Sequence, residues 1–180
     1  MDNQPWQAIR ACQQVIVLLD VAHAVEQQEL ERYLDASLRE HAIDATVHRI
    51  VLPVRRDPED PPVSPLKPLL ALDQETHVLP LRVVWRTSLE DKDIRPRPRD
   101  LLFGNPRRPG PWRARRILRQ HPERAVCIAG EPASLAELRH RLELRSGQVP
   151  DTEALAPFIA RQAALALDVA ERRLRGSRYK

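Results

Sequence analysis

The stretch that decides the fold lies near the start of the chain, where residues 13–21 read QQVIVLLDV. This short apolar run is rich in β-branched residues and is typical of a buried strand. Apolar positions near helical spacing in residues 22–42 predict an amphipathic helix, and residues 45–54, ATVHRIVLPV, predict a second strand. Strand, helix and strand within about forty residues form a βαβ unit, and a crossover of that length favours parallel pairing.

The rest of the chain continues the alternation of strands and helices. Pro80 interrupts the third predicted strand, so we expect an edge position or a bulge there. A capping box, SLAE at residues 134–137, opens one helix, and Gly176 ends the last. The predicted elements after residue 54 are one or two helical turns at 64–74, a strand at 76–86, a helix at 111–120, a strand at 125–130 and helices at 134–145 and 152–175, with irregular segments at 55–65 and 87–110.

This order predicts an α/β fold with a mainly parallel sheet of about four strands, flanking helices and a long C-terminal helix. We assign residues 1–150 to one α/β domain and residues 151–180 to a C-terminal helix leading out of it. That helix has a wide apolar stripe, which should pack on another element. The stripe comprises Leu155, Phe158, Ile159, Ala163, Leu165, Ala166, Val169 and Ala170.

Composition excludes several classes of protein. The chain has 180 residues, of which 42% are hydrophobic and 30% charged, as in a soluble globular protein. It has no signal-peptide pattern and no apolar run of about 18 residues that would cross a membrane. Five scattered glycines cannot form a nucleotide-binding loop. Cys12 and Cys127 lack the paired spacing of a zinc site, so we expect two buried free thiols, which fits the cytoplasm.

The positive charge of the chain is concentrated in its second part. Residues 1–80 carry a net charge of −6 and residues 81–180 one of +10, and residues 101–122 hold six arginines and no acid. A GC-rich genome could explain the preference for arginine, and a solvated helix face remains an alternative. An anionic membrane surface, a phosphorylated ligand and nucleic acid are the functional alternatives. The candidate contact residues are Arg107, Arg108, Trp112, Arg113, Arg115, Arg116 and Arg119.

The membrane alternative is favoured over nucleic acid because only Trp112 lies near the arginines, whereas base stacking needs several aromatic side chains. We expect Arg113, Arg116 and Arg119 to share one helix face. Three further residues follow or end strands, where open α/β sheets bind ligands: Asp20, His23 and Glu131. A carboxylate at Asp20 or Glu131 could hold a metal or a sugar hydroxyl, and His23 could simply start a helix. No set of histidines has metal-ligand spacing, and no cofactor or metal is predicted.

Four segments, in this order, resemble bacterial membrane-bound glycerol-3-phosphate acyltransferases of the large type. They are VLPLRVVW at 78–85, LLFGNPRRPGPWRARRIL at 101–118, CIAGEPASLAELRHR at 127–141 and ERRLRGSRYK at 171–180. In that family they precede the catalytic domain, and the resemblance covers residues 15–180. The family transfers an acyl chain from acyl-CoA or acyl carrier protein to glycerol 3-phosphate in phospholipid biosynthesis.

The resemblance implies an accessory N-terminal part of such an enzyme rather than its catalytic centre. The family uses a His-x-x-x-x-Asp motif, and no histidine of this chain has an aspartate five residues on. We therefore carry over no catalytic residue and expect the chain to be inactive alone. The resemblance further implies a fragment or a truncated product of a longer enzyme, with residues 151–180 leading toward the missing catalytic domain. The expected partners are that catalytic domain and an anionic membrane surface, at the cytoplasmic face of the inner membrane or in the cytoplasm. The arginine segment would contact anionic lipid headgroups or, as the alternative, the catalytic domain. The alternative is a free-standing α/β module that binds anionic lipid or a phosphorylated ligand.

Overall fold

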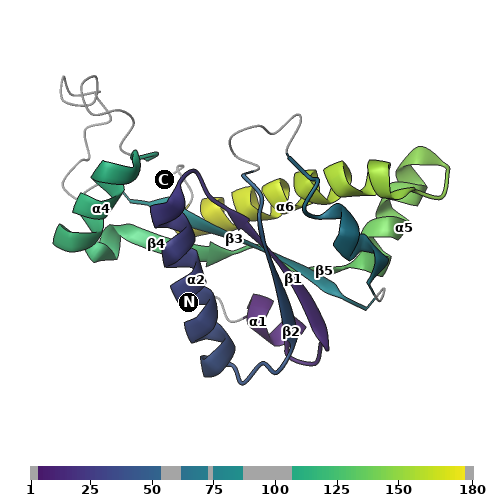
Figure 1. The fold of residues 1–180 in the computed structure, drawn as a ribbon, viewed down its shortest axis with the longest axis horizontal. Coiled ribbons are helices and arrows are strands. Elements are labelled where there is room, and N and C mark those ends of the chain that lie inside the picture. The colour runs from purple at the N-terminus through teal and green to yellow at the C-terminus, as the bar shows by residue number, and fades with distance from the viewer. Residues whose placement is uncertain (1–3, 54–61, 73–74, 87–106, 177–180) are drawn as a thin grey trace.

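The computed structural model describes residues 4–53, 62–72, 75–86 and 107–176, and these form a mixed α/β fold (Figure 1). The predicted irregular segments at 55–65 and 87–110 lie largely outside the described residues, as do residues 177–180 of the last resemblance segment. The elements are α1 (Gln4–Ile9), β1 (Gln14–Asp20), α2 (Ala24–Glu40), β2 (Thr46–Val51), η1 (Lys67–Ala71), β3 (His77–Trp85), α4 (Pro111–Gln120), η2 (Pro122–Arg124), β4 (Ala125–Ala129), β5 (Ala133–Ser134), α5 (Leu135–Ser146) and α6 (Thr152–Arg175).

The sheet has the order β2-β1-β3-β4, and the short β5 also pairs with β3. β1 pairs in parallel with both β2 and β3, which confirms the βαβ unit predicted from residues 13–54. β4 and β5 run antiparallel to β3. The sheet is therefore mainly parallel at its long strands, with an antiparallel edge that sequence periodicity alone does not reveal.

Helices cover both faces of the sheet, so the strands at its centre are buried on both sides. One core cluster joins alternate residues of β1 and β3 to α5, α6 and η1 and includes Ile16, Val78 and Ile159. The other joins the intervening strand residues to α1, α2 and α4 and includes Val17, Leu81 and Ile117. This two-sided burial explains why β1 and β3 are continuous apolar runs in the sequence. The short helix α1, which the sequence analysis missed, contributes Trp6 to the second cluster.

Pro80 lies in a central strand, so the expectation of an edge position is wrong. β3 runs between β1 and β4. The irregularity in strand pairing lies on the neighbouring edge of the sheet, between β4 and β5. Leu81 pairs with Ala129 and Val78 with Ala133, so two residues of β3 face three on the other side. The extra residue is a β-bulge at residues 130–132. The bulge accommodates the missing N–H of Pro80, whose carbonyl still accepts a hydrogen bond of 2.9 Å from the Gly130 N–H.

Gly130 allows α6 to approach the sheet closely. A Cβ at this position would lie 2.8 Å from Pro80 Cγ and 3.1 Å from Ala166 Cβ. We expect Gly130→Ala to lower the free energy of unfolding by about 1–3 kcal/mol, because neither the proline ring nor the helix can move without cost. Urea unfolding followed by circular dichroism measures this loss. Gly110→Ala is the control for steric clash, since nothing lies within 4 Å of a Cβ there, and it loses only the preference for glycine over alanine at the N-cap of α4. Equal stability of the two variants would contradict the close approach.

The predicted helix ends are confirmed with one change. Ser134 Oγ accepts from the Glu137 N–H at 3.1 Å, but the Glu137 carboxylate bonds Arg141 instead of completing the capping box. Gly176 is the C-cap of α6, with φ of 73°. The predicted apolar stripe of α6 does pack against the core, through Leu155, Phe158, Ile159 and Ala163, and Leu167 joins them. Two other members of the stripe, Leu165 and Val169, are exposed.

Candidate functional site

The carboxyl end of β1 is closed by a buried ion pair. Asp20 is directly opposite Arg82 in the sheet, and Arg82 Nε donates to Asp20 Oδ2 at 2.6 Å. The same guanidinium reaches α6, where Nη1 donates to Asp168 Oδ1 at 2.7 Å and to Glu171 Oε2 at 3.4 Å. Both Asp20 and Arg82 are buried. Asp20 is therefore engaged by a cation of the protein itself, which opposes its predicted role as a metal or sugar ligand.

The surroundings of Arg82 hold its charge in place. Burial alone would lower the pKa of Arg82, but attraction to Asp20 and the hydrogen bonds to Asp168 and Asp20 raise that pKa above its ordinary value. The Arg82 side chain therefore remains a charged guanidinium. It fixes α6 to the sheet through Asp168 and Glu171 of that helix. The sequence shows no signal for this contact, because Arg82 and Asp168 lie 86 residues apart.

A cysteine and a histidine meet at the opposite end of β3. Cys12 Sγ lies 3.1 Å from His77 Nδ1, which is also 2.9 Å from the Glu75 carbonyl oxygen. A carbonyl only accepts, so Nδ1 donates its hydrogen to Glu75 and has no lone pair to take the thiol proton. Burial, and then the charge of Glu75, also raises the pKa of the Cys12 thiol. This arrangement does not activate a nucleophile, and the sequence analysis did not anticipate it.

Both cysteines are free, but they are half-buried rather than buried as expected. Burial, and then the charge of Glu29, raises the pKa of the Cys127 thiol to about 12. Since only the thiolate attacks alkylating reagents, we expect Cys127 to react about a thousandfold more slowly at pH 8 than a thiol with an ordinary pKa. Mass spectrometry of the native Cys12→Ser variant during iodoacetamide treatment measures this rate. The same variant unfolded in guanidinium is the control, and equal rates would contradict the prediction.

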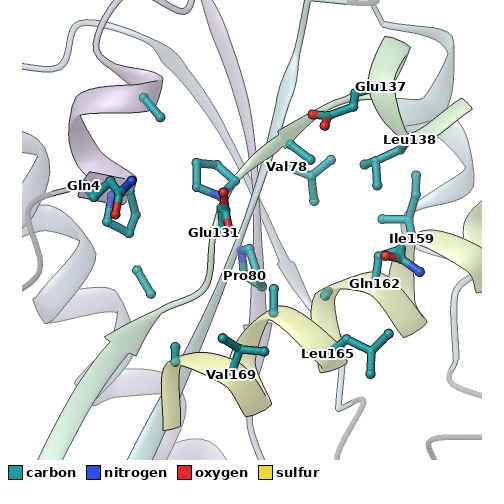
Figure 2. A pocket seen from close by; sticks show the side chains of 18 of the residues that line it. Gln4, Val78, Pro80, Glu131, Glu137, Leu138, Ile159, Gln162, Leu165 and Val169 are labelled. Atoms are coloured by element: carbon teal, nitrogen blue, oxygen red, sulfur yellow. The ribbon is translucent and has the colours of Figure 1, made fainter. Parts of the chain in front are cut away.

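Glu131 belongs to a surface groove rather than to the strand end where Asp20 lies. Because β4 runs antiparallel, its carboxyl end points toward the opposite edge of the sheet from that of β1. Figure 2 shows Glu131 beside Pro80 in the groove, with Val78 of the same strand to one side and α6 along the groove. The groove has a volume of about 370 Å³ and is lined mainly by apolar side chains, with Leu165 and Val169 on the α6 side. Asp20 and Glu131 therefore do not form a common site.

The arginine-rich segment predicted to be a helix forms α4. Gly110 is its N-cap and Pro111 occupies its first turn, where the missing N–H of proline is tolerated. Ala114 and Ile117 are buried in the same cluster as α2. Residues Trp112, Arg115, Arg116 and Arg119 have the i, i+3, i+4, i+7 spacing of one helix face, and all four are exposed. We call these four residues the α4 face.

The start of α4 is fixed to the start of α2 by His23. His23 Nε2 donates to the Pro109 carbonyl at 3.0 Å, while Nδ1 accepts from the Glu26 N–H at 3.4 Å as the N-cap of α2. Glu26 in turn accepts 2.7 Å hydrogen bonds from the Ala22 N–H and Trp85 Nε1. The helix-start interpretation of His23 is thus the one the structure supports, and these bonds determine how the α4 face is presented.

The arginines of the α4 face have no acidic partner among the described residues, in contrast to several arginines on other helices. In the part of the chain that the structure describes, no ion pair involves Arg115, Arg116 or Arg119, and Arg116 bonds only the neutral Gln120. Elsewhere Arg32 pairs with Glu29, Arg141 with Glu137 and Arg175 with Glu171. Like charges three or four residues apart destabilise a helix by about 0.2–0.5 kcal/mol per pair. The α4 face is therefore electrostatically unfavourable unless an external anion compensates it.

The remaining predicted contact residues lie beside this face. Arg107 and Arg108 are exposed just before α4, and Arg113 is half-buried on the side of the helix. The expected grouping of Arg113 with Arg116 and Arg119 is therefore only partly right. Trp112 is 68% exposed, whereas the other two tryptophans, Trp6 and Trp85, are buried. The structure thus places an exposed indole on the same helix face as Arg115, Arg116 and Arg119.

The described residues contain no group of three or more histidines, cysteines or acids that could hold a metal ion. Among them, too, no helix has both the length and the apolar character needed to cross a membrane. No family model matches the chain, and no solved structure matches it. The candidate site is the α4 face, because it combines an exposed tryptophan with three arginines that have no acidic partner among the described residues.

Proposed function

We propose that this chain is an accessory domain that binds an anionic membrane surface through the α4 face. The observation that carries the proposal is the exposed Trp112 on the same helix face as three arginines that have no acidic partner among the described residues. Arginine guanidinium groups bind phosphate oxygens with paired hydrogen bonds, and an indole prefers the interface between headgroups and acyl chains. The surface thus offers both components that a peripheral contact needs.

The expected strength of this contact is modest. Each basic residue near an anionic bilayer contributes about 1 kcal/mol, so Arg115, Arg116 and Arg119 together supply about 3 kcal/mol. Arg107, Arg108 and the indole of Trp112 add to this. Such a sum supports reversible binding and not permanent anchoring. The contact should therefore respond strongly to salt.

The ordered resemblance to the large glycerol-3-phosphate acyltransferases extends this proposal. We infer that the chain serves as an N-terminal accessory part of such an enzyme and helps to hold it at the cytoplasmic face of the inner membrane. The absence of a His-x-x-x-x-Asp motif from the sequence supports a role without catalysis in this chain. The acyl donor, acyl-CoA or acyl carrier protein, would then belong to the whole enzyme. A purified chain that acylates glycerol 3-phosphate above a blank would contradict this part of the proposal.

Trp112 provides the direct test of membrane binding. We expect its fluorescence to shift to shorter wavelength when vesicles of phosphatidylcholine mixed with phosphatidylglycerol are added, and not with pure phosphatidylcholine vesicles. The shift should shrink as salt rises from about 0.05 M to about 0.5 M, because screening weakens surface attraction. Trp6 and Trp85 are buried, so the change reports on Trp112.

The Trp112→Phe variant is the matched control for this measurement. It should lose the spectral shift and still float with anionic vesicles through its arginines. Equal flotation of the natural chain with anionic and neutral vesicles at low salt would overturn the membrane proposal. Binding of inorganic phosphate or glycerol 3-phosphate without vesicle binding would instead favour the module that takes a phosphorylated ligand.

A further inference from the structure

The C-terminal turn of α6 lies at the same end of the molecule as α4. Asp168 of α6 bonds Arg82, and β3 continues from there to Trp85, which pairs with Ala125 at the start of β4. Only η2 and one residue separate Ala125 from the end of α4. Figure 1 shows that the C-terminal end of α6 points toward the side of the fold where α4 lies, whereas α5 lies at the opposite end. An approaching surface can therefore meet both helices at this end.

This turn carries positive charge that the surrounding acids do not neutralise. Asp168 and Glu171 are engaged by Arg82, and Glu171 also bonds Arg175 at 2.6 Å. Arg172 and Arg173 are exposed, and neither forms an ion pair with any residue that the structure describes. The dipole of α6 favours basic residues in its last turn, so Arg172 and Arg173 are tolerated there without acidic partners. Their guanidinium groups can therefore bind an external anion.

An exposed apolar side chain accompanies these arginines, as on α4. Leu165, Val169 and Arg172 have the i, i+4, i+7 spacing of one helix face. Leu165 is 57% exposed and Val169 is 44% exposed. An apolar side chain next to unpaired arginines thus occurs twice at this end of the molecule, on two helices that cover opposite faces of the sheet.

We propose that the C-terminal turn of α6, through Arg172 and Arg173, is a second contact on the same anionic membrane surface. This inference rests on the proposed function of the α4 face. It fixes an orientation, in which the end of the molecule formed by α4 and the end of α6 faces the bilayer and α5 points away from it. Two contacts on opposite sides of the sheet restrict rotation of the protein on the surface.

Single charge reversals test this orientation. We expect Arg172→Glu and Arg173→Glu each to reduce partitioning onto phosphatidylglycerol-containing vesicles at least about fivefold at low salt. The matched control is Arg145→Glu, an exposed arginine at the end of α5. It makes the same change in net charge at the far end of the molecule, so it should change partitioning less than twofold. If circular dichroism shows that a glutamate variant does not fold, Arg172→Gln and Arg173→Gln replace it, with Arg145→Gln as their control. These variants should show a smaller loss of vesicle partitioning than the charge reversals, but still a larger loss than Arg145→Gln.

The outcomes separate this inference from the proposed function. If variants of the α4 face weaken vesicle binding but Arg172→Glu and Arg173→Glu behave like Arg145→Glu, the α6 contact is wrong and the proposed function stands. If the natural chain shows no preference for anionic vesicles, and no variant changes vesicle binding, the α6 contact and the proposed function are both contradicted. If light scattering shows a dimer that Val169→Asp converts to a monomer with vesicle binding unchanged, the α6 surface joins two copies of the chain and the inference is overturned.

Discussion

An Arg82→Met variant is expected to lose about 3–5 kcal/mol of unfolding free energy, the largest effect of any single substitution considered for this protein. Removing the guanidinium takes away the cation that is buried against Asp20, and breaking a buried ion pair by removing one partner is strongly destabilising. Asp168 is half-exposed and can be solvated by water, so most of the loss should come from Asp20. Urea unfolding at neutral pH measures the difference.

The double variant Asp20→Leu with Arg82→Met is the control for this interpretation. It removes both charges and replaces them with apolar side chains, so it should recover much of the stability lost by Arg82→Met alone. Equal instability of the single and double variants would show that Arg82 acts through packing or through α6. A loss below about 1 kcal/mol for Arg82→Met would contradict the buried pair itself.

Neutralising the α4 face is expected to reduce binding to anionic vesicles by about a hundredfold. Arg115→Gln, Arg116→Gln and Arg119→Gln together remove three charges, each contributing about 1 kcal/mol near an anionic surface. The same triple variant should be slightly more stable than the natural chain, because it removes repulsion between arginines three or four residues apart. Flotation with phosphatidylglycerol-containing vesicles and thermal unfolding measure the two effects.

A second triple variant, Arg32→Gln, Arg49→Gln and Arg141→Gln, makes the same change in net charge at arginines that have acidic partners. It should reduce vesicle binding much less and should not gain stability. A comparable loss of binding in both triple variants would mean that net charge, and not the α4 face, attracts the membrane. A loss of stability in the α4 variant would show that these arginines stabilise the fold.

Periodicity was sufficient to predict the elements that bury an apolar face, but it could not predict how they are joined. The alternation of β-branched and helical segments predicted β1, α2, β2 and α6 because each has a regular apolar pattern. The direction of β4 depends on tertiary packing, and the sequence between β3 and β4 does not encode it locally. Helix α1 escaped notice because its six residues are too few to show a period.

Only part of the candidate site could be predicted, because a pattern in the sequence is visible but tertiary contacts are not. An acid-free run of arginines is visible in the sequence, so the α4 segment was found, but its outward face depends on which residues contact α2. Buried Ala114 and Ile117 set that face, and Arg113 is turned away from its centre. The pairing of Asp20 with Arg82 joins two strands that are distant in the chain, which left Asp20 wrongly available as a ligand in the sequence analysis.

The bulge at residues 130–132 also determines how this protein behaves at high concentration. An exposed sheet edge can pair with the edge of another molecule and start aggregation. At the β4–β5 edge the bulge breaks the regular spacing of donors and acceptors, and Pro132 has no N–H to offer an incoming strand. The β2 edge has no such interruption across Thr46–Val51. Intermolecular strand pairing, and therefore fibril-like association, should begin at β2.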